Sequence, residues 1–235
     1  MIPADLVPPW RHIPPLAWLA AGAFTISRGP LGRAVLAAGW LVYLGVFIRA
    51  KAQRQLAAWH RSAVLIVSER PAQARWRGHL AVVASMPIMV LGLLLPYILM
   101  TVAAAAANAA GAYAAGRVLA DLAPVALVAP LALMVISVLP ALRLPMLRDT
   151  AAARHWIKDQ QEPLVVANTL AAAPTDRHAV TVLVRRLRRE ADARQLAILA
   201  LAGNDCLAED YRQLGFQQIL PGHPRVLHRT PRASR

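Results

Sequence analysis

Long apolar segments dominate the first 145 residues of the chain, whereas the remaining residues alternate between short apolar runs and charged stretches. Residues 80–107 and 122–142 carry no charged side chain. Each segment has at least the roughly 20 residues that a helix needs to cross the hydrocarbon core of a bilayer. Their internal prolines are compatible with spanning helices, because neighbouring helices can satisfy the freed backbone groups. The pattern predicts spans over about 80–103 and 120–142.

Two further apolar segments precede these. Residues 31–48 are apolar apart from Arg33, and residues 13–27 form a shorter run that begins with Pro14 and Pro15. We expect a third span at 31–48 and a fourth at 13–27, paired as a hairpin. The alternative for 13–27 is an interfacial or re-entrant segment, which leaves three spans. The transmembrane region is therefore expected to cover residues 1–145.

The C-terminal part has the periodicity of a small α/β module. Short apolar runs rich in β-branched residues predict strands, and apolar positions at helical spacing predict helices. The predicted order β-α-β-α-β-β covers residues 163–171, 178–193, 195–201, 208–214, 216–220 and 225–229. A strand, a helix and a strand in succession imply a parallel pair with a crossover. The predicted fold class is thus a helical membrane region of three to four spans, followed by a separate α/β domain over 146–235.

The distribution of charge suggests an orientation. The formal net charge is +14, and basic residues gather at the ends of the apolar segments, most of all in the connection 49–78. Such an excess belongs on the cytoplasmic side of a membrane. We expect a multi-pass protein of a bacterial-type inner membrane with a cytoplasmic C-terminal domain. The lipid bilayer is its predicted partner, and nucleic acid is not expected.

Residue types give little sign of metal or thiol chemistry. Cys206 is the only cysteine, and the seven histidines show no metal-ligand spacing, so no metal site is predicted. Small residues over 103–107 and near Gly111 suit close helix packing. This packing is compatible with a homo-oligomer or with a membrane partner.

One motif in the tail points to an activity. Asn204 follows an apolar run, Tyr211 stands seven residues later, and Gly215 and Phe216 follow at four and five residues further. This spacing, within the predicted element order, resembles the C-terminal half of the GNAT (Gcn5-related) N-acetyltransferases over about residues 160–230. The resemblance implies that acetyl-CoA lies in a gap between the fourth and fifth strands of the family's sheet. Its pyrophosphate would rest on the start of the helix between them.

The resemblance also implies roles for individual residues. Tyr211 would protonate the departing CoA thiolate, and Asn204 would lie beside the pantetheine arm. The pyrophosphate would meet the stretch Arg177, His178, Ala179, Val180 and Thr181. The implied function is a membrane-anchored acyltransferase that moves an acetyl group from acetyl-CoA, as co-substrate, to an amine.

A non-catalytic alternative stays open. Val180 and Val182 stand where the family has small residues, which favours a membrane scaffold or complex subunit whose GNAT-like module binds a partner. The family's first half is also missing ahead of residue 163. Residues 51–59 as a helix and 63–67 as a strand would supply pieces of it. Alternatively, this stretch is an interfacial segment with Trp59 and Trp76 at headgroup level.

Overall fold

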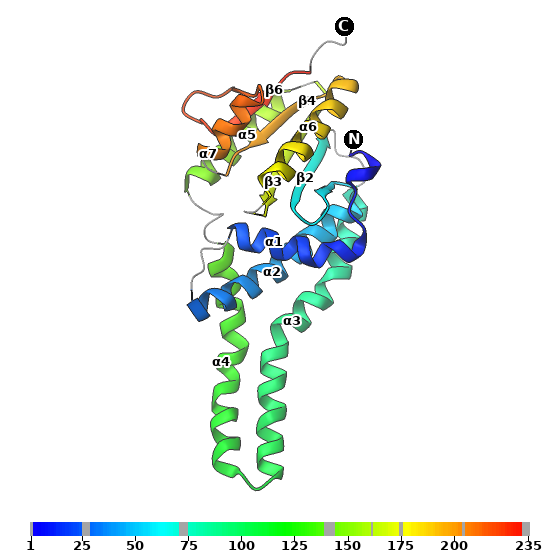
Figure 1. Cartoon of the computed structure of the whole chain (residues 1–235). Helices are drawn as coiled ribbons and strands as arrows, with labels where there is room; N and C mark the ends of the chain where they lie inside the picture. Colours follow the sequence, from blue (N-terminus) through cyan, green and yellow to red (C-terminus); the bar gives the residue numbers. More distant parts are fainter. Residues whose placement is uncertain are drawn as a thin grey trace.

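The computed structural model describes residues 2–24, 29–70, 75–138, 144–160, 162–173, 176–203 and 205–231. An α/β body carries a long helical hairpin that projects from one end (Figure 1). Two short 3-10 helices, Ala4–Leu6 and Trp10–His12, come first. The other elements are α1 (Ile13–Phe24), α2 (Gly29–Ala52), β1 (Leu56–Trp59), β2 (Ala63–Arg70), α3 (Arg75–Ala109), α4 (Tyr113–Val138), α5 (Leu144–Asp159), β3 (Leu164–Ala172), α6 (Arg177–Ala193), β4 (Ala197–Leu201), α7 (Asp205–Gln213), β5 (Gln217–Gln218) and β6 (Val226–Arg229).

A six-stranded mixed sheet organises the body. Its strand order is β1-β2-β3-β4-β6-β5. β3 and β4 run parallel, and every other neighbouring pair is antiparallel. β2 and β3 are adjacent in the sheet although the hairpin and α5 separate them in the sequence, with Arg70 paired to Leu164. The register between them shifts once, between Val64 and Ile66.

Helices cover both faces of the sheet, as the alternation of side chains along the strands requires. On one face, α5 packs against β3, β4 and β6 through Ala153 and Ile157, while α1 and α2 cover β1, β2 and the end of β3. On the other face lie α6 and α7, which bury Leu183 and Ala208. The body is therefore a three-layer arrangement with its cores on both sides of the sheet.

The predicted fold class is wrong in two respects. First, the sheet is not confined to residues 146–235, because β1 and β2 come from the connection 49–78 and pair with each other and with β3. Residues 63–67 do form part of a strand, whereas residues 56–59 are a strand and not a helix. Second, the described residues contain two helices long and apolar enough to cross a membrane, within α2 and α4, and not three or four.

The described part of the segment 13–27, which ends at Phe24, does not provide a span; residues 25–27 lie outside the described residues. α1 has 12 residues, which corresponds to about 18 Å, well short of a hydrocarbon core of about 30 Å. Its side chains Ile13, Leu16, Ala17 and Ala20 are buried between the sheet and α2. An apolar helix that is covered by protein on several sides has the same sequence pattern as one covered by lipid, which explains the error.

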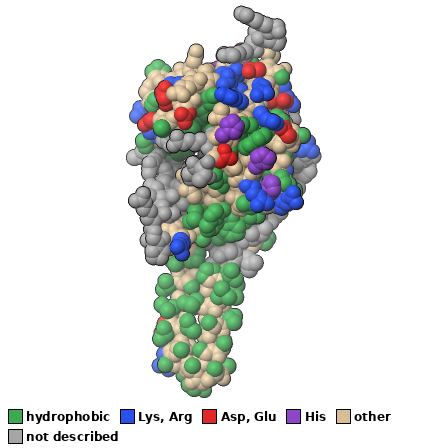
Figure 2. Space-filling view, in the orientation of Figure 1, with side chains coloured by type: hydrophobic (Ala, Val, Ile, Leu, Met, Phe, Trp, Pro, Cys, Tyr) green, Lys and Arg blue, Asp and Glu red, His purple; other side chains and the backbone are tan. Residues whose placement is uncertain are grey.

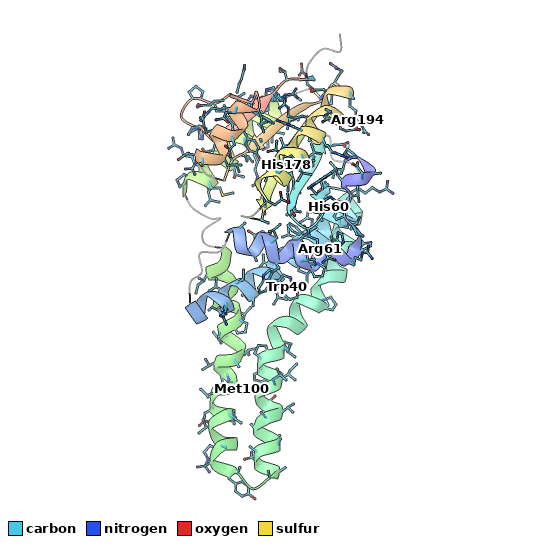
Figure 3. All side chains as sticks on the ribbon, in the orientation of Figure 1. Trp40, His60, Arg61, Met100, His178 and Arg194 are labelled. Carbon is cyan, nitrogen blue, oxygen red and sulfur yellow. The ribbon has the colours of Figure 1, made fainter. Side chains whose placement is uncertain are left out.

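The segment 31–48 lies in α2, whose apolar window Val35–Ala52 is 39% buried within the protein. Figure 1 shows α1 and α2 lying across the direction of the hairpin, between it and the sheet. The indole Nε1–H of Trp40 donates to the carbonyl oxygen of Pro14 at 2.9 Å and so ties α2 to α1 (Figure 3). α2 therefore crosses the base of the hairpin, where it packs against α1, α3 and α4.

The predicted span 80–103 lies within α3, and the span 120–142 lies within α4 up to Val138, while residues 139–142 are outside the described residues. The two helices pack against each other as an antiparallel hairpin. The connection at the tip is short. Gly111 adopts a left-handed φ of 80°, and the Ala112 N–H donates to the Ala107 carbonyl at 2.8 Å. A glycine is the residue best suited to this conformation, so the chain reverses over very few residues.

Candidate functional site

The parallel strands β3 and β4 separate part of the way along their length. Their ladder begins at Leu164 and Ala197 and ends at Ala167 and Ala200. Beyond this point β3 continues to Ala172 and stays paired with β2, whereas Leu201 pairs with β6. Among the described residues, no strand pairs with β3 on its β4 side over residues 168–172. β4 itself ends at Leu201, so within the described chain alternate backbone groups of β3 lack a strand partner beyond the end of β4, and we call this open edge the β3–β4 gap.

The helix that follows β3 has a capped N-terminus. A carboxylate oxygen of Asp176 accepts a hydrogen bond from the Ala179 N–H at 3.0 Å. This is a standard N-cap interaction, which satisfies one of the orphan donors of the first turn. It also places a negative charge where the resemblance expects a pyrophosphate.

The residues predicted to bind the cofactor are distributed around this helix start. The His178 side chain is exposed, and Figure 3 shows it on α6. Ala179 is fully buried against the sheet, and Val180 and Thr181 are half-buried. The Arg177 side chain and Asn204 lie outside the described part of the chain. Of the stretch predicted to bind the pyrophosphate, some described residues therefore lie in the core and others at the surface.

Tyr211 projects from α7 into the core below the gap. The residue is 4% exposed, and its ring lies 5.3 Å from that of Phe216. Burial, with a smaller contribution from the carboxylate of Asp210, raises the pKa of Tyr211 well above its usual value. Tyr211, Ala167 and Ala200 line a void of about 20 Å³ between α6 and the sheet. The phenol consequently stands next to the last residue pair of the β3–β4 ladder.

Gly215 and Phe216 have a clear structural role. Gly215 has a φ of 86°, and its N–H donates to the Arg212 carbonyl at 2.9 Å, while the Phe216 N–H donates to the Tyr211 carbonyl at 3.1 Å. Together these bonds close the C-terminus of α7 in a left-handed turn. The turn brings the Phe216 ring against Tyr211. The predicted helix end at Gly215 is confirmed.

A second group of polar residues was not expected from the sequence. Nδ1 of His223, in the loop between β5 and β6, lies 2.7 Å from Oδ1 of Asp149 on α5. Asp149 is 7% exposed. Nearby, Arg225 binds Asp205 through Nε at 2.8 Å and Nη2 at 3.2 Å. No element is predicted from the sequence over residues 146–162, where Asp149 lies on α5, and His223 lies between the predicted strands 216–220 and 225–229.

The remaining ion pair of note supports the architecture. Arg229 on β6 is 5% exposed, and both of its terminal nitrogens lie 2.8 Å from the carboxylate oxygens of Asp192 on α6. Such bidentate geometry is the strongest that an arginine and a carboxylate can adopt. It fixes the last strand against α6 and so holds the neighbouring β4 in place.

Two kinds of chemistry find no support in the described residues. They contain no group of three or more His, Cys, Asp or Glu side chains that could hold a metal ion. Cys206 is a free, exposed thiol on α7. The candidate chemistry therefore concentrates at the β3–β4 gap with Tyr211, and around the Asp149–His223 pair.

The projecting part of the hairpin has an apolar surface. Figure 2 shows hydrophobic side chains along its whole length, with tan surface between them and a basic patch near the tip, while most basic and acidic side chains gather on the body. Large exposed side chains include Leu95, Tyr97, Leu99, Val102, Val118, Leu122, Val125, Val128, Leu131 and Val135. An exposed apolar surface of this extent on a protein marks a contact with lipid or with another protein.

Comparison with known proteins identifies no relative. No protein-family model matches the chain. No curated protein matches it either.

Proposed function

We propose that the chain is an integral membrane protein in which the α3–α4 hairpin anchors a GNAT-like acyltransferase body at the cytoplasmic face of a bacterial-type inner membrane. The body would transfer an acetyl group from acetyl-CoA to an amine. The observation that carries the enzymatic part is the separation of β3 and β4 beside Tyr211. The anchor rests on the length and surface of the hairpin.

The dimensions of α4, the second helix of the hairpin, fit a bilayer, and α3 contributes a shorter apolar stretch, Leu94–Ala109. The apolar window of α4, Tyr113–Leu133, has 21 residues, which corresponds to about 31 Å against a hydrocarbon core of about 30 Å. Only 11% of this window is buried within the protein. Lipid tails would cover the remaining side chains without the cost of keeping them in water.

The charges around the hairpin support the cytoplasmic placement of the body. A hairpin returns to the side from which it entered, so both parts of the body lie on one side of the membrane. Arg75 and Arg77 stand at the start of α3, and Arg143 and Arg148 flank the start of α5. Near the tip of the hairpin, Arg117 is the one basic residue among the described residues. This asymmetry agrees with the positive-inside rule.

The gap between β3 and β4 suits an extended, amide-containing ligand. The β3 edge over 168–172 offers backbone donors and acceptors on the side that β4 leaves. A pantetheine arm, which contains two amides, could add to this edge as a short strand would. Ahead of β3 the body also contains α1, α2, β1 and β2, besides the hairpin and α5. α1, α2 and the two strands supply most of the first half, three strands and two helices, that the resemblance requires.

The proposed chemistry is direct transfer. The nitrogen of an unprotonated amine attacks the thioester carbonyl, a C–N bond forms and the C–S bond breaks. The CoA thiolate leaves and takes a proton, for which Tyr211 is the proposed donor. Burial raises the pKa of Tyr211, so the phenol carries its proton but is a weaker acid than an ordinary tyrosine, and the donation needs the ligand to change the surroundings of the hydroxyl. The amine nitrogen loses its surplus proton to water or to a nearby base.

A specific observation favours the non-catalytic alternative. The carboxylate of Asp176 already accepts from the first turn of α6, where the resemblance needs a pyrophosphate. A body that had lost acyl-CoA binding would keep the sheet and the anchor and would act as a membrane scaffold. Calorimetry distinguishes the two functions, because a scaffold binds no acetyl-CoA.

The test is titration of acetyl-CoA into the full-length, detergent-purified protein, together with an acyl-transfer assay over a panel of amines. We expect micromolar to millimolar binding, kept by Tyr211→Phe, and a turnover that Tyr211→Phe lowers about 100-fold. Tyr113→Phe at the exposed hairpin tip is the matched control and should change neither quantity. Absence of binding at millimolar acetyl-CoA would contradict the acyltransferase and favour the scaffold.

A further inference from the structure

A cavity of about 590 Å³ lies between the first turns of α5 and the loop that joins β5 to β6. Its walls come from Pro145, Leu147, Arg148, Asp149, Gly222, Pro224 and Arg225. This volume falls within the range of small-molecule sites, about 300 to 1,000 Å³. The void beside Tyr211, at about 20 Å³, could hold no more than a water molecule. Among the described residues, this cavity is therefore the better place for a whole small ligand.

His223 lies between two residues that line the cavity, Gly222 and Pro224, and pairs with a third, Asp149. The Asp149 carboxylate is buried and lies 2.7 Å from Nδ1 of His223. A carboxylate at this distance keeps a proton on Nδ1, which leaves Nε2 to exchange a hydrogen bond or a proton with another molecule. No hydrogen bond or ion pair of Nε2 occurs within the described residues. The His223 side chain is 16% exposed, so the imidazole keeps some contact with solvent beside the cavity.

Two arginines give the cavity its affinity for anions. Arg225 is held by Asp205 through Nε and Nη2, which fixes the guanidinium plane and leaves Nη1 for another acceptor. Arg148 is exposed and has no carboxylate within ion-pair distance in the described part of the chain. Planar guanidinium groups bind carboxylate and phosphate oxygens in a bidentate manner.

The start of α5 also favours the binding of an anion in the cavity. Pro145, Leu147 and Arg148 of its first turns line the cavity, and the helix has 16 residues with no acidic side chain in the first turn. The positive end of the α5 dipole therefore faces the cavity, and no acidic side chain in the first turn of this helix offsets it. This is the opposite of α6, where Asp176 occupies the helix start.

We propose that this cavity binds a phosphate monoester with a compact apolar group. Arg148, Arg225 and the start of α5 hold the phosphate, Pro145, Leu147 and Pro224 contact the apolar group, and Nε2 of His223 bonds a polar atom of the ligand. The Ala202 N–H donates to the Arg225 carbonyl at 3.0 Å, so the cavity wall continues into the end of β4, beside the β3–β4 gap. The site does not depend on acyl-CoA, because none of its residues belongs to β3, α6 or α7 except Asp205, which only holds Arg225.

The probe is phenyl phosphate, titrated by calorimetry into the full-length protein in a neutral detergent without acetyl-CoA. We expect a Kd below about 1 mM, weakened at least about tenfold by Arg148→Ala. Arg154→Ala is the matched control, because Arg154 is an exposed arginine of the same helix outside the cavity, and it should bind as the unmodified protein does. The His223 ring nitrogens should shift in ¹⁵N spectra on addition of the probe, and a His223→Gln variant should lose those signals.

Short-chain phosphatidic acid, used below its micellar concentration, separates two sources of the phosphate. Binding tighter than that of phenyl phosphate, with the same dependence on Arg148, assigns the site to a lipid headgroup, whereas weaker binding assigns it to a water-soluble ester. The proposal is overturned if phenyl phosphate does not bind at 10 mM, about ten times the expected Kd limit. It is equally overturned if Arg148→Ala and Arg154→Ala weaken binding alike, since attraction by net charge alone would give that result.

Discussion

Asp176 offers a way to test the acyl-CoA site with a gain of affinity instead of a loss. Its carboxylate caps α6 by accepting from the Ala179 N–H at 3.0 Å. A pyrophosphate bound to the same helix start would bring phosphate oxygens within about 4 Å of this carboxylate. At that distance the repulsion per unit charge is about 1 kcal/mol in a water-like medium and about 4 kcal/mol near a protein surface.

Asp176→Asn removes this repulsion and keeps the cap. Asparagine caps helices about as well as aspartate, so the free energy of unfolding should change by less than about 0.5 kcal/mol. The lower estimate of the repulsion, about 1 kcal/mol, already predicts acetyl-CoA affinity about fivefold higher, and the upper estimate predicts far more than tenfold. Asp176→Ala also removes the charge, but it should lower the free energy of unfolding by about 1 kcal/mol.

The assay is calorimetric titration of acetyl-CoA into the three proteins at low salt, with urea unfolding as the stability measurement. Dephospho-CoA and pantetheine serve as ligands with fewer phosphates or none, and the gain should shrink along that series. If Asp176→Asn binds acetyl-CoA no better than the unmodified protein, the pyrophosphate does not lie at the start of α6, and this part of the resemblance is incorrect.

Three further predictions concern stability and are measured by denaturant unfolding in detergent. Arg229→Met breaks the bidentate pair with Asp192. It should lower the free energy of unfolding by about 2 kcal/mol, because the carboxylate left without a partner is only partly exposed. The control Arg194→Met breaks an exposed pair and should lower it by less than about 0.5 kcal/mol. Gly215→Ala should cost about 1 kcal/mol, since alanine is strained at a φ of 86°; an unchanged midpoint would contradict that φ. Burial lowers the pKa of His228, so this histidine binds a proton more readily in the unfolded chain than in the folded one. The free energy of unfolding should therefore be highest above about pH 6.5 and should fall as the pH drops towards the folded pKa. His228→Gln should remove this part of the pH dependence.

The local elements of the tail could be predicted because each carries its own pattern. β3, α6, β4, α7 and the closing strands lie within a few residues of the predicted ranges. The parallel β3–β4 pair follows from the strand, helix and strand order. Periodicity and turn residues suffice for such features, since they depend on neighbours only a few positions away.

The partners of the sheet could not be predicted in the same way. Ile66 pairs with Asn168 and Ser68 with Val166, about a hundred residues apart, and no local pattern encodes that distance. For the same reason the sequence concealed the pairing of Asp149 with His223. The prediction of a span at 13–27 is wrong for a different reason. A helix buried between the sheet and α2 requires the same apolar residues as a helix surrounded by lipid.

The hairpin interrupts the sheet between two strands that lie side by side. β2 ends at Arg70, and its partner β3 begins at Leu164. At a synthesis rate of about 5 to 20 residues per second, β2 waits roughly 5 to 20 seconds for its neighbour to leave the ribosome. During that interval its open edge is available to other chains, while α3 and α4, the proposed anchor, are being made. The sheet can therefore close only after the ribosome has passed the hairpin, so a chain whose hairpin folds incorrectly also presents an incomplete sheet to the cell's proteases.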